Sequence, residues 1–307
     1  LDTKTYLSNI DDNYVKTNND KIEKEFDGLA KPVGSLGKLE KIAAQIAGIT
    51  HSHTPTVDPA AIALFGADHG IAFDDSVTPW PQAITGLMLE VMGDNKAAVS
   101  VLADVSDVYC QYINVGAVSD SKSRAVRNER VKNGTQDIRT DNAMSREEAI
   151  AAMNVGAQTA ERLIAGGSRS LCTGEVGIGN TTPSAALIAH FAKASAQEVT
   201  GRGSGIDDET YARKVEIVEQ LIFKTKKTTD PIDVLAQIGG LEIALSNYRK
   251  GLYEAWDTNV PSQGSPQAIF TVDPSEPQRW YQQGRSSTVW QRRCITNQLG
   301  LYRTAGP

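Results

Sequence analysis

Three short strand-like runs, separated by helix-like stretches, constrain the fold of this 307-residue chain more than any other feature. They are residues 60–66, 108–115 and 168–173, and each is closed by or followed by a glycine. A short, continuous apolar run suits a strand that is buried on both faces, as in a parallel sheet. Strands that alternate with helices predict βαβ units, and therefore an α/β fold whose mainly parallel sheet is covered on both faces.

Several helices are expected between and after these runs. A capping box formed by Ser145 and Glu148 predicts a helix start at residue 145. A helix should also follow the Pro- and Gly-containing loop at 31–37, and two more are expected over 182–194 and 207–223.

The composition argues against several classes of protein. The net charge is −6, which disfavours nucleic-acid binding through a basic surface. No apolar run of about 18 residues is present, so neither a membrane span nor a secretory signal is expected. The cysteines are widely spaced and read as core residues in a reducing cytoplasm. His51 and His53 lie two residues apart, but a solvated loop is favoured over a metal clamp, and no metal is expected.

Polar, Gly-rich segments follow the strand-like runs at 68–70, 116 and 174–180. Ligands of open α/β sheets bind beyond the carboxyl ends of the strands, so the candidate site is placed there. The segment 174–180 is predicted to be a turn between a strand and a helix. Its backbone is suited to an anion, since glycines allow N–H groups to approach and the helix N-terminus adds partial positive charge. The candidate residues are Gly174, Glu175, Val176, Gly177, Ile178 and Gly179.

This turn fits neither of two common nucleotide-binding motifs. Asn180 stands where a Walker loop needs lysine, and the pattern is not GxGxxG, so an ATPase and a nicotinamide dinucleotide fold are both disfavoured. A tight strand-to-helix turn without a ligand stays open as an alternative.

A second Gly-rich segment contains Gly203, Ser204 and Gly205 and precedes a predicted helix that carries Lys214. Backbone donors and a nearby lysine suit a phosphate group, although a flexible surface loop is an equal alternative. A third segment contains Asp68 and His69, which could be an acid/base pair or a hydrogen-bonded loop. Further along, Thr78-Pro79-Trp80 could line an aromatic ligand's pocket or serve packing alone.

Six segments together resemble the nicotinate-nucleotide–dimethylbenzimidazole phosphoribosyltransferases of cobalamin lower-ligand assembly. They occur in family order between about residues 29 and 244, namely 31–40, 67–72, 133–138 with 143–144, 174–182, 201–206 with Lys214, and 239–244. The string Gly-Glu-x-Gly-Ile-Gly-Asn-Thr-Thr is the most specific of them.

The resemblance implies a three-layer, Rossmann-like α/β domain and a smaller helical domain built from both chain ends. Residues 1–50 would belong to the small domain and 51–244 to the nucleotide-binding domain. It also implies a cytoplasmic homodimer that transfers phosphoribose from nicotinate mononucleotide to 5,6-dimethylbenzimidazole without a metal or redox cofactor. Glu175 would be the catalytic carboxylate, and the two Gly-rich segments with Lys214 would hold phosphate. Thr78, with Asp68 and His69, would lie by the base.

Residues 245–307 depart from the family. The net charge changes sign near residue 244, and three of the four tryptophans lie beyond it. The family's Gly-Glu-Gly-x-Gly motif, which carries the glutamate regarded as general base, is absent there. Glu175 is then the one carboxylate candidate left. The alternatives are a catalytically impaired relative or damaged gene product that binds nucleotide, and a different enzyme that uses the same phosphate cradle.

Overall fold

The computed structural model describes residues 21–50, 52–54, 56–203 and 205–243. Ser204, His51 and the atypical segment 245–307 therefore lie outside the described residues, as does much of the expected small domain. The division into domains stays a prediction.

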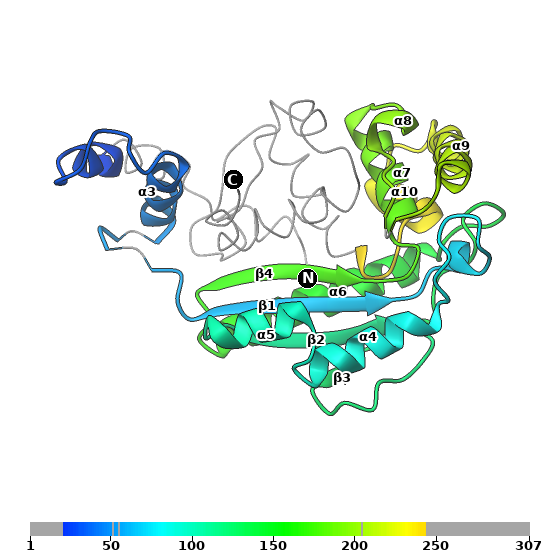
Figure 1. Cartoon of the computed structure of the whole chain (residues 1–307), viewed down its shortest axis with the longest axis horizontal. Helices are drawn as coiled ribbons and strands as arrows, with labels where there is room; N and C mark the ends of the chain where they lie inside the picture. Colours follow the sequence, from blue (N-terminus) through cyan, green and yellow to red (C-terminus); the bar gives the residue numbers. More distant parts are fainter. Residues whose placement is uncertain (1–20, 51, 55, 204, 244–307) are drawn as a thin grey trace.

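A four-stranded parallel sheet forms the centre of the described structure (Figure 1). Its order is β3-β2-β1-β4, with every neighbouring pair parallel. The strands are β1 (Ala60–Ala67), β2 (Tyr109–Gly116), β3 (Val126–Asn128) and β4 (Ser170–Val176). Three of them match the predicted runs, whereas β3 was not predicted because three residues are too short to show a pattern.

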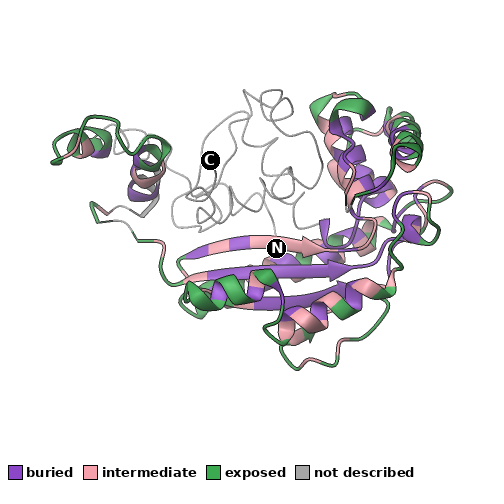
Figure 2. Cartoon of the chain, in the orientation of Figure 1, coloured by how far each residue is buried: buried purple, intermediate pink, exposed green. Residues whose placement is uncertain are grey.

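Helices cover both faces of the sheet, which confirms the α/β fold. Alternate residues of β1 divide between two hydrophobic clusters, because successive side chains of a strand point to opposite faces. Ala63 and Phe65 pack in the cluster that contains Ala149 of α6 (Arg146–Ala165). Leu64 packs with Leu89 of α4 (Ala83–Gly93). Helix α5 (Ala98–Val105) lies on the same face as α4, and β1 and β2 are buried along most of their length (Figure 2).

The predicted start of α6 is confirmed in atomic detail. The Ser145 hydroxyl accepts the Glu148 N–H at 3.1 Å, and the Glu148 carboxylate accepts the Ser145 N–H at 2.8 Å. These two bonds satisfy backbone donors that have no partner inside the helix.

Four further helices gather beyond the carboxyl end of the sheet (Figure 1). They are α7 (Thr181–Ala192), α8 (Ala196–Val199), α9 (Asp208–Thr225) and α10 (Pro231–Ile238). The predicted helices 182–194 and 207–223 correspond to α7 and α9. Asp207 fixes the start of α9, because its side chain accepts the Thr210 N–H at 2.8 Å.

The end of β4 differs from the prediction. The run was expected to end at residue 173 and Glu175 to lie in a turn, but β4 continues to Val176. The backbone of β1 extends the pairing, since Leu64, Phe65 and Gly66 are in register with residues 174–176. Glu175 is therefore held by a sheet rather than by a loop.

The N-terminal part forms its own small packing unit. Residues 21–27 are helical, and α3 (Lys38–Thr50) follows the predicted loop. Ile22 packs with Ala44 and Ala47 of α3. Lys31 and Glu40 close the intervening loop with an ion pair of 2.7 Å.

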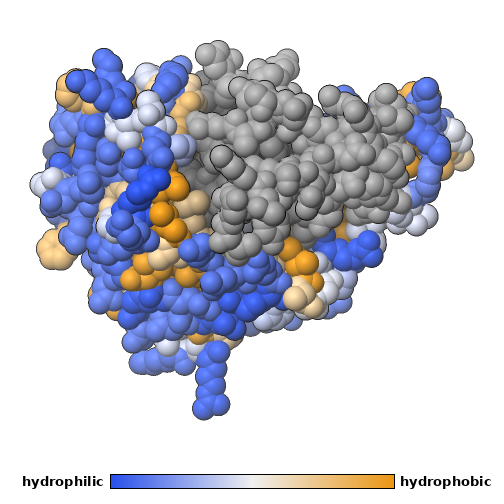
Figure 3. All heavy atoms as spheres, turned by 180° about the vertical axis from the view of Figure 1, so that it is seen from behind, coloured by the Kyte–Doolittle hydropathy of each residue, from blue (hydrophilic) through white to orange (hydrophobic). Residues whose placement is uncertain are grey.

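The surface seen from behind is mainly hydrophilic where it is described, with apolar areas that are small and separate (Figure 3). Among the described residues, no helix has both the length and the apolar character needed to cross a bilayer.

Candidate active site

A buried histidine–glutamate pair lies where β1 ends. The Nε2 atom of His69 is 2.6 Å from Oε1 of Glu242, and both residues are only 1 % exposed. His69 follows β1 by two residues, whereas Glu242 follows α10 and is 173 residues further along the chain. The pair thus joins two distant segments at the carboxyl edge of the sheet.

The sequence left Glu175 as the one candidate for the catalytic carboxylate, and the structure adds a second buried glutamate, Glu242, at this edge. Glu242 was noticed only as part of the 239–244 segment and received no role. A signal was present, because Glu242 is a charged residue in an otherwise apolar and Gly-containing stretch, and such a residue needs a partner if buried.

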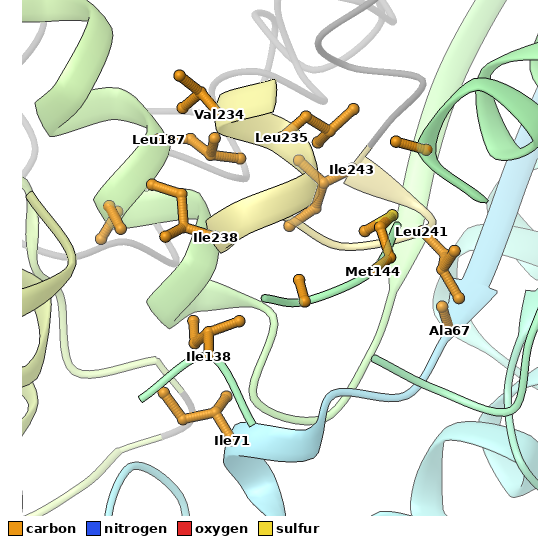
Figure 4. Close-up of a cluster of buried hydrophobic side chains, with 14 of the residues drawn as sticks. Ala67, Ile71, Ile138, Met144, Leu187, Val234, Leu235, Ile238, Leu241 and Ile243 are labelled. Carbon is orange, nitrogen blue, oxygen red and sulfur yellow. The ribbon is translucent and has the colours of Figure 1, made fainter. Parts of the chain in front are cut away.

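Hydrophobic packing on either side brings Glu242 to this position. Leu241 and Ile243 belong to the main core cluster, and Leu241 lies beside Ala67 (Figure 4). Gly240 allows the backbone to lie close to the His69 ring, and Gly116 leaves room for the Leu241 side chain. A Cβ atom on Gly240 would lie 2.5 Å from Cε1 of His69, and one on Gly116 would lie 2.3 Å from Cδ1 of Leu241.

Glu175 stands next to the pair, at the end of β4. Its carboxylate accepts a hydrogen bond from the side-chain amide of Asn180. Burial, and then repulsion from Glu242, raises the pKa of Glu175 to about 7, although the Asn180 bond and His69 act in the opposite direction. Glu175 is consequently a carboxyl group that can gain or lose a proton near neutral pH.

Asp68 completes the cluster and also fixes a loop. Its Oδ2 accepts the Val118 N–H at 2.8 Å, so the loop-fixing interpretation of Asp68 is the one seen in the structure. Burial raises the pKa of Asp68 above its usual value, against the effect of the Thr85 hydroxyl. Burial also disfavours the charged form of His69, but the surrounding carboxylates, Glu242 first, hold the pKa of His69 above its usual value.

The second Gly-rich segment lies beside a buried lysine. Lys214 is 1 % exposed, and its ammonium group donates to the Thr181 hydroxyl at 2.6 Å and to the Gly201 carbonyl at 3.1 Å. No carboxylate of the described residues pairs with it, and burial lowers the pKa of Lys214 to about 8. A Cβ atom on Gly203 would lie 3.6 Å from the Lys214 nitrogen, so Gly203 lies beside the ammonium group.

The glycines of the first segment are explained by packing. A Cβ atom on Gly177 would lie 2.4 Å from the Ala67 carbonyl oxygen, and one on Gly179 would lie 2.8 Å from the Ala72 Cβ. The Ile178 N–H donates to the Thr85 hydroxyl at 3.0 Å. Phosphate contact through Val176, Gly177, Ile178 or Gly179 stays a prediction, whereas the strand-to-helix turn from Gly177 onward is a fact of the structure.

In the segment that carries Thr78, it is Gln82 that contacts the cluster. Gln82 donates from Nε2 to the His69 carbonyl oxygen at 2.5 Å, whereas the Thr78 hydroxyl accepts the local Trp80 N–H at 3.3 Å. A role in base binding for Thr78, Asp68 and His69 stays a prediction. Thr85 is a further buried contact that sequence reasoning left without a role.

Comparison with known proteins decides the family. A family model described as Phosphoribosyltransferase matches residues 13–247, which is more than half of the chain. The chain belongs to this phosphoribosyltransferase family.

Relatives named nicotinate-nucleotide–dimethylbenzimidazole phosphoribosyltransferase support the same assignment. The protein of Halalkalibacterium halodurans is 38% identical over 224 residues, covering 73% of this chain and 62% of the relative. The protein of Salinispora tropica is 39% identical over 234 residues, covering 70% and 64%. The chain thus spans about three fifths of the length of these curated relatives.

A solved structure agrees in fold. The crystal structure of CobT from Thermus thermophilus superposes with a TM-score of 0.70 at 30% identity, covering 77% of this chain and 72% of that one. The family resemblance inferred from the six segments is confirmed, and so is the mainly parallel α/β fold.

The structure brings most of the predicted site residues into two neighbouring groups. The first is an acid–imidazole cluster made by Asp68, His69, Glu175 and Glu242. The second is the lysine site, made by Lys214, Thr181 and Gly203. Gly174 lies within β4, and Gly205 adopts a positive φ of 99° that suits glycine alone.

Proposed function

We propose that this chain transfers phosphoribose from nicotinate mononucleotide to 5,6-dimethylbenzimidazole and releases nicotinate and α-ribazole 5′-phosphate. The names of its relatives support this substrate pair. The single observation that carries the proposal is the buried ammonium group of Lys214, which has two neutral oxygen partners and no acid among the described residues.

A phosphate group fits this lysine for a physical reason. A buried cation is costly unless an anion compensates it, and Lys214 already loses affinity for its proton through burial. The N-terminus of α7, which begins at Thr181 and carries no acidic residue in its first turn, adds partial positive charge beside the same spot. The nucleotide's phosphate is therefore placed between Lys214, Gly203 and the start of α7.

Glu175 is proposed as the general base. One ring nitrogen of the benzimidazole attacks the ribose C1 from the face opposite the pyridinium, which inverts β to α. As the new N–C1 bond forms, the old bond breaks, and its electron pair neutralises the pyridinium nitrogen of nicotinate. The proton on the other ring nitrogen passes to Glu175, whose pKa of about 7 suits a base that works near neutral pH. Nearby dipoles can steady the charge that develops on the sugar.

A second candidate function is nucleotide binding with little turnover. The family match ends at residue 247, and the matched part covers 62% of the Halalkalibacterium halodurans relative. The sequence after that point contains no Gly-Glu-Gly-x-Gly motif. If Glu175 acts without that second glutamate, turnover should fall by about 10²–10⁴-fold, the usual contribution of a positioned acid or base.

One experiment separates the two candidates. Product formation from both substrates is measured for this chain, for Glu175→Gln and for a full-length relative, with nucleotide binding measured in parallel. Glu216→Gln serves as control, because Glu216 is an exposed glutamate of α9. If this chain turns over within tenfold of the relative's rate, and Glu175→Gln loses that turnover, the result supports transfer. Slow turnover with normal nucleotide binding supports the second candidate. Loss of binding contradicts both.

The setting of this activity is part of the proposal. The partners are the two small molecules and a second copy of the chain, with no nucleic acid or membrane, and the location is the cytoplasm. Sedimentation at micromolar concentration tests the homodimer, and a purely monomeric species would contradict it.

A further inference from the structure

The acid–imidazole cluster contains more negative than positive charge. Asp68, Glu175 and Glu242 are its carboxyl groups, and among the described residues His69 is the cation that acts on them. All four residues come from the ends of β1 and β4 and from the segment after α10. With every group ionised, the cluster would carry two uncompensated negative charges.

Buried uncompensated charge is costly enough that groups change their protonation instead. The cluster therefore holds at least one carboxyl proton near neutral pH, and the contacts decide where that proton lies. Asp68 has the Val118 N–H on Oδ2, and the Thr85 hydroxyl favours its charge, although burial still raises its pKa and its Oδ1 has no partner among the described residues. Glu242 has the His69 ring at 2.6 Å. Glu175 has only the neutral amide of Asn180.

We propose that His69 and Glu242 form a positioning pair for Glu175. The pair commits the cluster's positive charge to Glu242, so that Glu175 becomes the carboxyl group that holds and releases the cluster's proton. This inference rests on the proposed function for its catalytic meaning, since it explains how Glu175 becomes a base matched to neutral pH.

The surroundings hold the ring of His69 in this arrangement. Ideal Cβ positions on Gly177 and Gly240 lie 3.1 Å and 2.5 Å from its Nε2 and Cε1 atoms, so the backbone encloses the ring on both sides. Gln82 holds the His69 carbonyl oxygen at 2.5 Å. Glu242 is fixed between Leu241 and Ile243 of the core. The other oxygen of Glu242, Oε2, is buried and has no partner among the described residues.

The pairing has a direct electrostatic consequence. Repulsion from Glu242 raises the pKa of Glu175, and this effect is larger than the opposing attraction of His69. If Glu242 loses its charge, His69 also loses the main group that keeps it charged. Removing the pair should therefore lower the pKa of Glu175, in spite of the lost imidazolium.

The decisive measurement follows the Glu175 carboxyl group in the free protein by infrared difference spectroscopy across a pH titration. Glu175→Gln identifies its band. Glu242→Gln should fold, because it keeps shape and size, and should move the Glu175 midpoint to lower pH by roughly one pH unit. The control Glu216→Gln removes one charge at an exposed site and should leave the midpoint unchanged. An unchanged midpoint in folded Glu242→Gln would overturn the proposal.

His69→Gln provides an independent second arm. Without the ring, Glu175 loses the attraction of the imidazolium while Glu242 still repels it, so the Glu175 midpoint should move to higher pH, opposite to the shift in Glu242→Gln. An unchanged or lowered Glu175 midpoint in a folded His69→Gln protein would contradict the role of the pair. Both arms use free protein, so they can succeed even if phosphoribosyl transfer fails. If transfer is measured, the acidic limb of kcat/KM should move with the Glu175 midpoint in Glu242→Gln.

Discussion

The ammonium nitrogen of Lys214 lies 2.6 Å from the hydroxyl oxygen of Thr181, the first residue of α7. This contact joins two segments that are 33 residues apart, the start of α7 and the middle of α9. It brings a buried positive charge to the positive end of a helix, an arrangement that becomes favourable when an anion binds between them.

The first prediction concerns nucleotide affinity. Lys214→Met should weaken nicotinate mononucleotide binding by about 10- to 100-fold, because a charge-assisted contact contributes roughly 1.5–3 kcal/mol. Isothermal titration calorimetry at pH 7 gives the affinity. Arg213→Gln is the matched control, since Arg213 is the exposed neighbour of Lys214 and should bind nucleotide normally. Equal affinities of Lys214→Met and the unmodified chain would remove Lys214 from the site.

The second prediction concerns protons taken up on binding. Burial lowers the pKa of Lys214 to about 8 in the free protein, so much of it is neutral above that pH. A bound phosphate should favour the charged form, and binding between about pH 8 and pH 9.5 should then take up a fraction of a proton. Calorimetry in two buffers of different ionisation enthalpy measures this uptake. It should vanish in Lys214→Met, and uptake that persists there would assign it to another group.

The third prediction compares two glycines of one motif. Gly177→Ala should lower the free energy of unfolding by about 1–3 kcal/mol, because its Cβ would lie 2.4 Å from the Ala67 carbonyl oxygen. Gly174→Ala should lower the free energy of unfolding by less, because its Cβ would lie 3.5 Å from the Leu64 side chain, an ordinary van der Waals contact. Urea unfolding of both variants tests this difference. The packing explanation fails if Gly174→Ala is the more damaging change.

The fourth prediction concerns stability and pH. In the folded protein the pKa of Glu175 is raised to about 7 from its ordinary 4.5. The folded state therefore binds this proton more tightly than the unfolded state, and the associated stability is present below about pH 4.5 and is lost as pH rises through 7. The glutamine in Glu175→Gln cannot ionise. The free energy of unfolding of this variant, relative to that of the unmodified chain, should therefore rise as the pH increases from 5 to 8.5, by at most a few kcal/mol.

Urea unfolding at several pH values measures this trend, with Glu216→Gln as the control for loss of an exposed carboxylate. Parallel stability curves for Glu175→Gln and the unmodified chain would contradict the raised pKa.

Local pattern determined much of the secondary structure. The apolar runs predicted β1, β2 and the beginning of β4, and the Ser145 capping box gave the start of α6. These features depend on residues that lie close together in the sequence, so they can be predicted directly from the spacing of apolar and capping residues. The Gly-rich segments were likewise visible from their composition, and Lys214 from its place in the helix that follows the second of them.

Tertiary structure decided where these pieces meet. Glu175 lies on β4 rather than in a turn because β1 continues the ladder past residue 173. Strand order is a second example, since nothing in the runs indicates that β1 lies between β2 and β4. Sheet pairing depends on strands that are distant in sequence, so no short window contains the information.

The sequence by itself determined that this chain is a parallel α/β protein with a Gly-rich edge and the motifs of its phosphoribosyltransferase family. Only the tertiary structure placed Glu242 against His69, across 173 residues. The apolar residues around Glu242 pack into the core because burying them is favourable, and they take the carboxylate with them. A buried charge must then find a partner, and that partner depends on which distant segment the core has brought within hydrogen-bond distance.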